Sequence, residues 1–162
     1  TLQRDIGAPM SPFNAFMFLQ GLETLPLRMR AHCQNAARVA NFLAGHEKVV
    51  KVIYPSHQDG EMRRRADAYL EGSSYGALLG FELAGGREAG RRFIDALQLV
   101  YHVANIGDAR TLAIHPASTT HSQLSPEDRL ATGVSEGYVR LSIGIEHVDD
   151  IIGDLAQALE AA

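Results

Sequence analysis

The chain has 162 residues, a formal net charge of −4 and one cysteine, Cys33. This length suits one domain with a hydrophobic core. The net negative charge argues against sequence-independent binding of nucleic acid. No apolar run approaches the roughly 20 residues that a membrane helix needs, and no signal-peptide pattern is present. A single cysteine excludes an internal disulfide and fits a reducing, cytoplasmic location.

Two absences stand out in the sequence. The chain starts at Thr1, without an initiator methionine, so we expect it to be a processed or partial product of a longer protein. Lysines are also scarce, since the chain has only Lys48 and Lys51 and thirteen arginines.

The N-terminal part predicts an extended lead-in and then a helical arm. Residues 1–12 contain two prolines and a glycine and are expected to be extended. Apolar residues at helical spacing from Phe13 predict a helix that ends near Leu25, because Pro26 lacks an amide hydrogen. The helical pattern then resumes over residues 27–43.

Strand and helix patterns alternate through the rest of the chain. Ser125 followed by proline and two acids is a strong helix start. Alternating or β-branched segments predict strands at 49–54, 77–83, 99–103, 111–114 and 138–143, and amphipathic or charged segments predict helices at 61–70, 87–97, after Ser125 and at 148–159. This order predicts an α/β or α+β domain with helices packed on an open sheet.

Arg140 is the most informative residue for function. In the expected strand 138–143, the apolar side chains of Val139 and Leu141 alternate with Arg140, so the guanidinium lies on the opposite face. Arginine matches a carboxylate with two parallel hydrogen bonds, which predicts a clamp for an amino-acid carboxylate. The alternative is a surface arginine with a salt-bridge partner.

Other polar segments support two interpretations each. Asn105 lies in a tight turn and offers its side-chain amide or neighbouring backbone groups to an anion, or else it only forms the turn. Residues 115–121 are dense in hydroxyls and imidazoles and predict a pocket wall or a self-satisfied turn. The basic run 63–65 is expected to be a solvated helix face. No metal site and no catalytic motif can be identified.

Several segments, taken together, resemble the C-terminal part of the Cys/Met-metabolism pyridoxal-phosphate enzymes. The resemblance runs through the whole chain in the family's order. Glu23, Asn105 and His147 make the chain most similar to the O-acetylhomoserine sulfhydrylases. The alternatives are the O-succinylhomoserine sulfhydrylases, the cystathionine γ-synthases and lyases, and the methionine γ-lyases. The segments are SPFNAF (11–16), QGLETLPLRM (20–29), ANIGDA (104–109), HPASTTHSQL (115–124) and VRLSIGIEHVDDII (139–152).

The resemblance implies an aspartate-aminotransferase-like (fold-type-I) architecture. Residues 1–45 would form the lead-in and linking arm. Residues 46–162 would form the small C-terminal domain, a mostly antiparallel sheet with helices packed on one side. The large N-terminal domain that holds the cofactor would be absent from this chain.

The resemblance also implies an activity for the whole enzyme. Pyridoxal phosphate would support replacement of the acetate of O-acetylhomoserine by sulfide, giving homocysteine for methionine biosynthesis. Arg140 would bind the substrate α-carboxylate, Asn105 would assist, and Thr120 would present a hydroxyl near the active-site mouth. The enzyme would be a homo-oligomer, a dimer or a tetramer, without nucleic-acid or membrane partners.

The lysine that binds the cofactor in this family lies in a Ser-x-Thr-Lys setting. Neither Lys48 nor Lys51 has that setting. We therefore expect no cofactor-binding or catalytic residue in this chain, no bound cofactor, and no activity of the chain alone. Two non-catalytic interpretations remain: an amino-acid-binding module that uses Arg140, or an oligomerisation module that uses the apolar arm.

Overall fold

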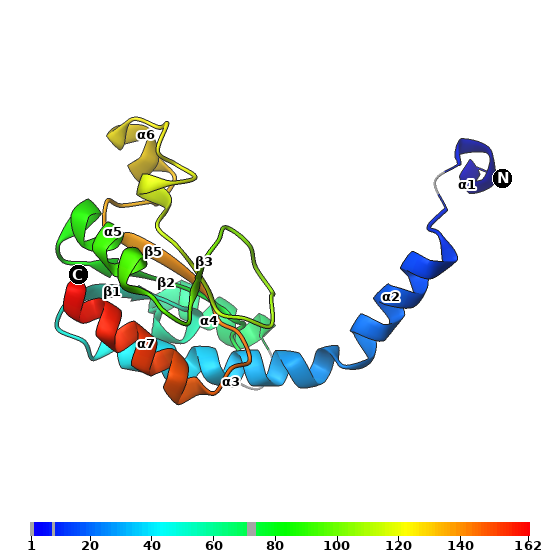
Figure 1. Ribbon diagram of the computed structural model, residues 1–162, viewed down its shortest axis with the longest axis horizontal. Helices are drawn as coiled ribbons and strands as arrows, with labels where there is room; N and C mark the ends of the chain where they lie inside the picture. Colours follow the sequence, from blue (N-terminus) through cyan, green and yellow to red (C-terminus); the bar gives the residue numbers. More distant parts are fainter. Residues whose placement is uncertain (1, 8, 71–73) are drawn as a thin grey trace.

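The computed structural model describes residues 2–7, 9–70 and 74–162 (Figure 1). Its helices are α1 (Leu2–Ile6), α2 (Pro12–Glu23), α3 (Leu25–Ala44), α4 (Gly60–Tyr69), α5 (Gly86–Ala96), α6 (Pro126–Ala131) and α7 (Val148–Ala161). Its strands are β1 (Val49–Ile53), β2 (Leu78–Leu83), β3 (Tyr101–His102), β4 (Leu112–Ile114) and β5 (Tyr138–Ser142), and 3-10 turns occur at η1 (Pro55–His57) and η3 (Pro116–Ser118). Within the described ranges, no helix is long and apolar enough to cross a membrane.

The arm begins differently from the sequence prediction. Leu2–Ile6 forms a short helix, so the expectation of an extended segment over residues 1–12 is wrong there, while residues 1 and 8 lie outside the described ranges. The prolines at 9 and 12 follow this helix and therefore cannot prevent it. Gly7, with φ 74°, ends it in a conformation that glycine adopts without strain.

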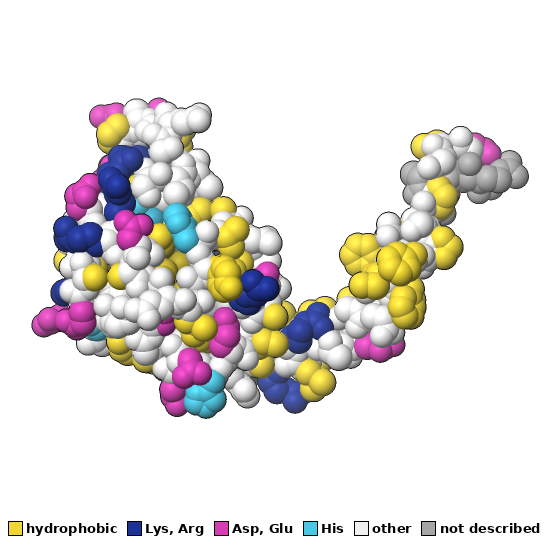
Figure 2. All heavy atoms as spheres, in the orientation of Figure 1, with side chains coloured by type: hydrophobic (Ala, Val, Ile, Leu, Met, Phe, Trp, Pro, Cys, Tyr) yellow, Lys and Arg dark blue, Asp and Glu magenta, His cyan; other side chains and the backbone are white. Residues whose placement is uncertain are grey.

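The predicted break in the arm at Pro26 is confirmed. Helix α2 starts at a cap in which Ser11 Oγ accepts a hydrogen bond from the Asn14 amide at 3.2 Å. It ends at Glu23, and Pro26 lies in the first turn of α3, where its missing amide hydrogen costs nothing. Helix α2 extends away from the body of the molecule (Figure 1) and buries none of its residues. Figure 2 shows hydrophobic side chains gathered along it.

The sheet has the strand order β1-β2-β5-β4-β3. All neighbouring pairs are antiparallel except β3 and β4, which run parallel. Strand β5 lies at the centre, with Arg140 directly opposite Gly80 of β2 and Ile114 of β4. Arg140 therefore projects from the middle of the sheet.

One face of the sheet carries the hydrophobic core. Val139 and Leu141 of β5 are fully buried, as is Phe81 of β2, whose ring meets Phe93 of α5 edge-on at 5.4 Å. Helices α3, α5 and α7 cover this face. The predicted fold class, a mostly antiparallel sheet with helices on one side, is confirmed. Helix α4 is the exception, because it borders the face that bears Arg140.

Polar contacts fasten the helical layer to the ends of the strands. The buried His32 Nδ1 donates to the carbonyl of Ile143 at 2.6 Å. The buried Asp154 of α7 accepts hydrogen bonds from the backbone amides of Gln98, Leu99 and Val100, each at 2.9 Å. The three backbone amides that precede β3 therefore each have a hydrogen-bond partner.

Candidate functional site: the cavity beside Arg140

The structure brings Arg140 and Asn105 together. Arg140 is half-buried on β5, and its Nη2 donates a hydrogen bond to the backbone carbonyl of Asn105 at 3.2 Å. Its Nε is buried and has no hydrogen-bond partner among the described residues. The guanidinium is thus anchored on one side and retains unused donors on another.

The turn that holds Asn105 is closed by its own hydrogen bonds. Asn105 Oδ1 accepts from the amide of Ile106 at 2.9 Å, and the amide of Gly107 donates to Ser142 Oγ at 3.1 Å. Gly107 has φ 76°, which a side chain would disfavour. The side chain of Asn105 therefore shapes the turn, and its backbone carbonyl makes the contact with Arg140.

Thr120, the third predicted residue, lies elsewhere. It is exposed just after η3, and its Oγ1 is 2.9 Å from His121 Nδ1. It does not line the cavity beside Arg140. Within the described chain the geometry thus groups two of the three predicted substrate-binding residues.

A cavity of about 620 Å³ opens on the Arg140 face of the sheet. The strands β1, β2 and β5 form one side, and η1 and α4 form the other. Most of the wall is apolar; its polar side chains with charged or hydrogen-bonding ends are Tyr54, Gln58, Arg65, Tyr138 and Arg140. A concave apolar site with a few polar groups is the usual form of a small-molecule site.

Tyr138 forms part of this cavity wall in a way that the sequence analysis missed. Its ring lies over Gly80, where a Cβ would stand 2.4 Å from the ring. Burial raises the pKa of the Tyr138 hydroxyl, and the nearby Arg140 opposes that shift. The glycine inside a strand pattern was the available signal, since such a residue often marks close approach by another group.

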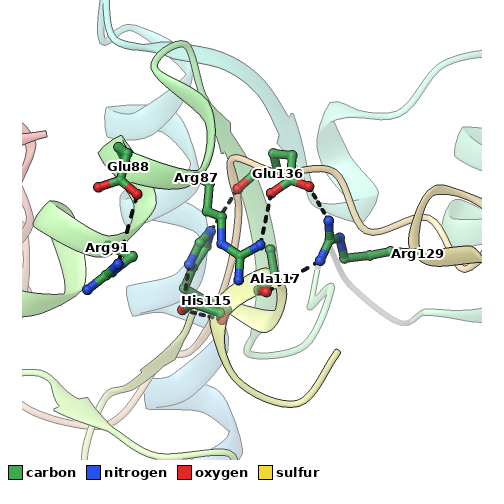
Figure 3. Close-up of polar contacts among 8 residues, drawn as sticks. Arg87, Glu88, Arg91, His115, Ala117, Arg129 and Glu136 are labelled. Carbon is green, nitrogen blue, oxygen red and sulfur yellow. Dashed lines mark hydrogen bonds and ion pairs between the residues drawn. The ribbon is translucent and has the colours of Figure 1, made fainter. Parts of the chain in front are cut away.

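His115 supports the interpretation of residues 115–121 as a self-satisfied turn. The ring is fully buried, with Nδ1 at 2.9 Å from Ser118 Oγ and Nε2 donating to the carbonyl of Glu136 at 2.8 Å (Figure 3). A Cβ at Gly90 would stand 2.5 Å from Nε2, so the ring needs that glycine. Burial lowers the pKa of His115, although the hydrogen bond to Glu136 opposes this.

Arg129 completes the same network. It is 3% exposed, and its guanidinium contacts the Glu136 carboxylate and the carbonyl of Ala117 (Figure 3). Glu136 also lies 3.9 Å from Arg87. These contacts fix η3 from both sides and use both ring nitrogens of His115, so we assign the network to structure. Arg87, Ser118 and Thr119 line a separate cavity of about 300 Å³ beside it.

The two lysines do not fit covalent attachment of pyridoxal phosphate. Lys48 Nζ donates to three carbonyls at the end of α7, those of Leu159, Glu160 and Ala162, at 2.9, 2.9 and 3.3 Å. Lys51 is exposed on β1. Neither lines the cavity beside Arg140. Among the described residues, no group of three or more His, Cys, Asp or Glu side chains is arranged to hold a metal ion.

The chain belongs to the Cys/Met metabolism PLP-dependent enzyme family, whose model matches residues 1–160. It is 51% identical over 157 residues to O-acetyl-L-homoserine sulfhydrylase of Leptospira meyeri, covering 97% of this chain and 36% of that protein. It is 48% identical to homocysteine synthase of Schizosaccharomyces pombe, covering 98% of this chain and 37% of that protein.

A solved structure has the same fold. The crystal structure of an O-acetylhomoserine (thiol)-lyase from Campylobacter jejuni, which contains a pyridoxyl-lysine monophosphate, matches with a TM-score of 0.87 and 46% identity. The match covers 99% of this chain and 38% of that one. The chain therefore spans little more than a third of the length of these relatives, and the resemblance inferred from the motifs is confirmed.

Proposed function

We propose that this chain is the carboxylate-binding part of a pyridoxal-phosphate-dependent O-acetylhomoserine sulfhydrylase. The whole enzyme would replace the acetate of O-acetylhomoserine by sulfide and produce homocysteine for methionine biosynthesis. The names of the most similar relatives support this activity. One structural observation carries it: Arg140 projects from the central strand into a cavity while Asn105 holds one of its nitrogens.

The chemistry of Arg140 suits an α-carboxylate. The Asn105 carbonyl fixes Nη2, and within the described chain no hydrogen bond uses Nη1. A carboxylate would meet a guanidinium whose position is already set, so little side-chain entropy is lost on binding. Clamping the carboxylate orients the rest of the amino acid relative to the cofactor, which supplies the electron sink.

Further parts of the proposal concern the assembly. Residues 1–45 would act as the linking arm and residues 46–162 as the small domain of a cytoplasmic homodimer or homotetramer. The exposed apolar side chains of α2 support a buried position for the arm in such an assembly. Thr120 would lie near the substrate only after another part of the enzyme is added. The cofactor would be held by residues outside this chain.

Titration of the isotope-labelled chain with O-acetyl-L-homoserine tests the carboxylate clamp by NMR. We expect shifts of the Arg140 side chain and of the amides at 105–107, and their loss in Arg140→Gln. Arg38→Gln is the matched control, because Arg38 pairs with the exposed Asp149 away from the cavity. Equal binding by wild type and Arg140→Gln would contradict the clamp.

The proposed division of labour has its own test. Pyridoxal phosphate added to the chain is expected to give no long-lived visible absorbance band and no sulfide-dependent release of homocysteine. A stable band together with turnover would show that the chain attaches the cofactor and works alone.

A further inference from the structure

The cavity beside Arg140 contains a second arginine, Arg65 of α4, and no acid balances the two charges. No aspartate or glutamate is among the described residues that line it. We propose that this cavity binds an aliphatic dicarboxylate, with one carboxylate at Arg140 and the other at Arg65. The inference rests on the proposed function only for the role of Arg140 at one end.

Arg65 differs from its neighbours on α4. Arg63 Nε pairs with the Asp67 carboxylate at 2.9 Å, and Arg64 pairs with Glu61. Within the described chain, Arg65 has neither an ion-pair partner nor a hydrogen bond. The basic run, expected to be a solvated helix face, thus contains two arginines paired on the helix and one, Arg65, that is exposed and unpaired and lines the cavity.

The charge of the cavity selects the ligand class. Two guanidinium groups without a lining carboxylate favour an anion, and a partly apolar wall strengthens that attraction relative to open water. Arg140 is half-buried and Arg65 is exposed, and a ligand that supplies a carboxylate to each guanidinium makes two charge-assisted contacts where a single charge makes one.

The wall between the arginines is apolar and favours an aliphatic connection. Met62 and Ala66 of α4 face this space on one side, and Ile53 and Leu78 line it from the strands. Tyr138 lines it as well, and its hydroxyl has no hydrogen bond within the described chain. A flexible chain of methylene groups can bury itself here, while a compact inorganic anion would leave this surface in water.

A dicarboxylate in this position has a consequence for the proposed reaction. It occupies Arg140, the group that we assign to the α-carboxylate of the amino acid. The dicarboxylate and the amino acid therefore compete, and a dicarboxylate acts as an inhibitor whose affinity depends on Arg65.

Calorimetric titration of the 162-residue chain with glutarate, adipate, hexanoate and hexane-1,6-diol tests the inference. We expect the better dicarboxylate to bind roughly tenfold more tightly than hexanoate, since a charge-assisted hydrogen bond adds about that factor. The diol is expected to bind most weakly. Arg65→Gln is expected to remove the difference between dicarboxylate and monocarboxylate.

Arg64→Gln is the matched control, because it removes the same charge from the adjacent position of the same helix without touching the cavity. It should keep the tenfold difference, and Arg65→Lys should restore part of it. Far-UV circular dichroism checks that each variant is folded. The inference is overturned if adipate, glutarate and hexanoate bind equally, or if Arg64→Gln and Arg65→Gln have the same effect.

The two proposals fail separately. If Arg140→Gln leaves amino-acid binding unchanged, the carboxylate clamp is contradicted. The comparison of Arg65→Gln with Arg64→Gln would still decide whether the second carboxylate has its own partner.

Discussion

Gly80 lies directly beneath the ring of Tyr138, so that a Cβ on Gly80 would stand 2.4 Å from Tyr138 Cε2. Gly80 also faces Arg140 across the β2–β5 pair. The absence of a side chain at one position thus sets the place of a tyrosine and keeps space open next to the arginine. The shape of the cavity depends on this glycine.

Gly80→Ala is expected to destabilise the chain by about 1–3 kcal/mol, because the added methyl group overpacks the Tyr138 ring. It should also weaken carboxylate binding, since the displaced ring narrows the cavity. Urea unfolding measures the first effect and calorimetric titration the second. Gly21→Ala in α2 is the control: nothing lies within 4 Å of its Cβ, so it should stabilise the helix by about 0.5–1 kcal/mol. Similar effects of both substitutions would argue against close contact at Gly80.

Asp154→Asn is expected to cost about 1–3 kcal/mol, because its carboxylate serves three backbone amides and an amide group turns a donor toward one of them. Chemical denaturation measures the loss, and hydrogen exchange at residues 98–100 should accelerate. Asp150→Asn, at the exposed start of α7, serves as the comparison and should change stability by well under half that amount. An equal loss from both would mean that Asp154 acts only through the helix charge.

His115 makes stability depend on pH in a direction that its environment fixes. Burial lowers its pKa in the folded chain, whereas the unfolded chain has the ordinary imidazole value of about 6.5. Below about pH 6.5 the unfolded state therefore binds a proton that the folded state does not. The stabilisation is complete above that pH and is lost as pH falls toward the lower folded value, by at most about 1.4 kcal/mol per pH unit.

Denaturation from pH 7.5 to 5 tests this dependence. His115→Gln should flatten the curve, although it is less stable overall. His121→Gln, which alters a partly exposed ring outside this buried network, is the comparison and should keep the slope of the wild type. If His115→Gln keeps the full slope, another group is responsible for the acid sensitivity.

Local signals in the sequence predicted most of the elements. Ser125 with Pro126 marked the start of α6, and the structure has Ser125 Oγ accepting from the Asp128 amide at 3.1 Å. The alternation around Arg140 correctly assigned its side chain to the face opposite the core. These features depend on a few neighbouring residues, which is why the sequence alone reveals them.

The rest of the site depends on contacts between distant segments. Arg65 looked like its neighbours in the sequence, and only the packing of α4 beside the sheet separates it from Arg63 and Arg64. The carbonyl of Asn105 contacts Arg140 because β4, which follows the Asn105 turn, pairs with β5, which carries Arg140. No local pattern in the sequence indicates this contact. The sequence analysis missed the short helix α1 because it applied the extended conformation that Pro9 and Pro12 favour to residues 2–6 as well, although these residues precede both prolines.

The bonds from α3 to the segment after β5 also bear on how the chain folds. His32 meets the carbonyl of Ile143 across 111 residues of sequence, and Asn35 meets that of Gly144 across 109. Loops of that size carry a large closure entropy before any contact is gained, and contacts so distant in sequence slow folding. During synthesis, α3 can therefore pack on β1 and β2 first, and its hydrogen bonds to residues 143 and 144 can form only after β5 has been made.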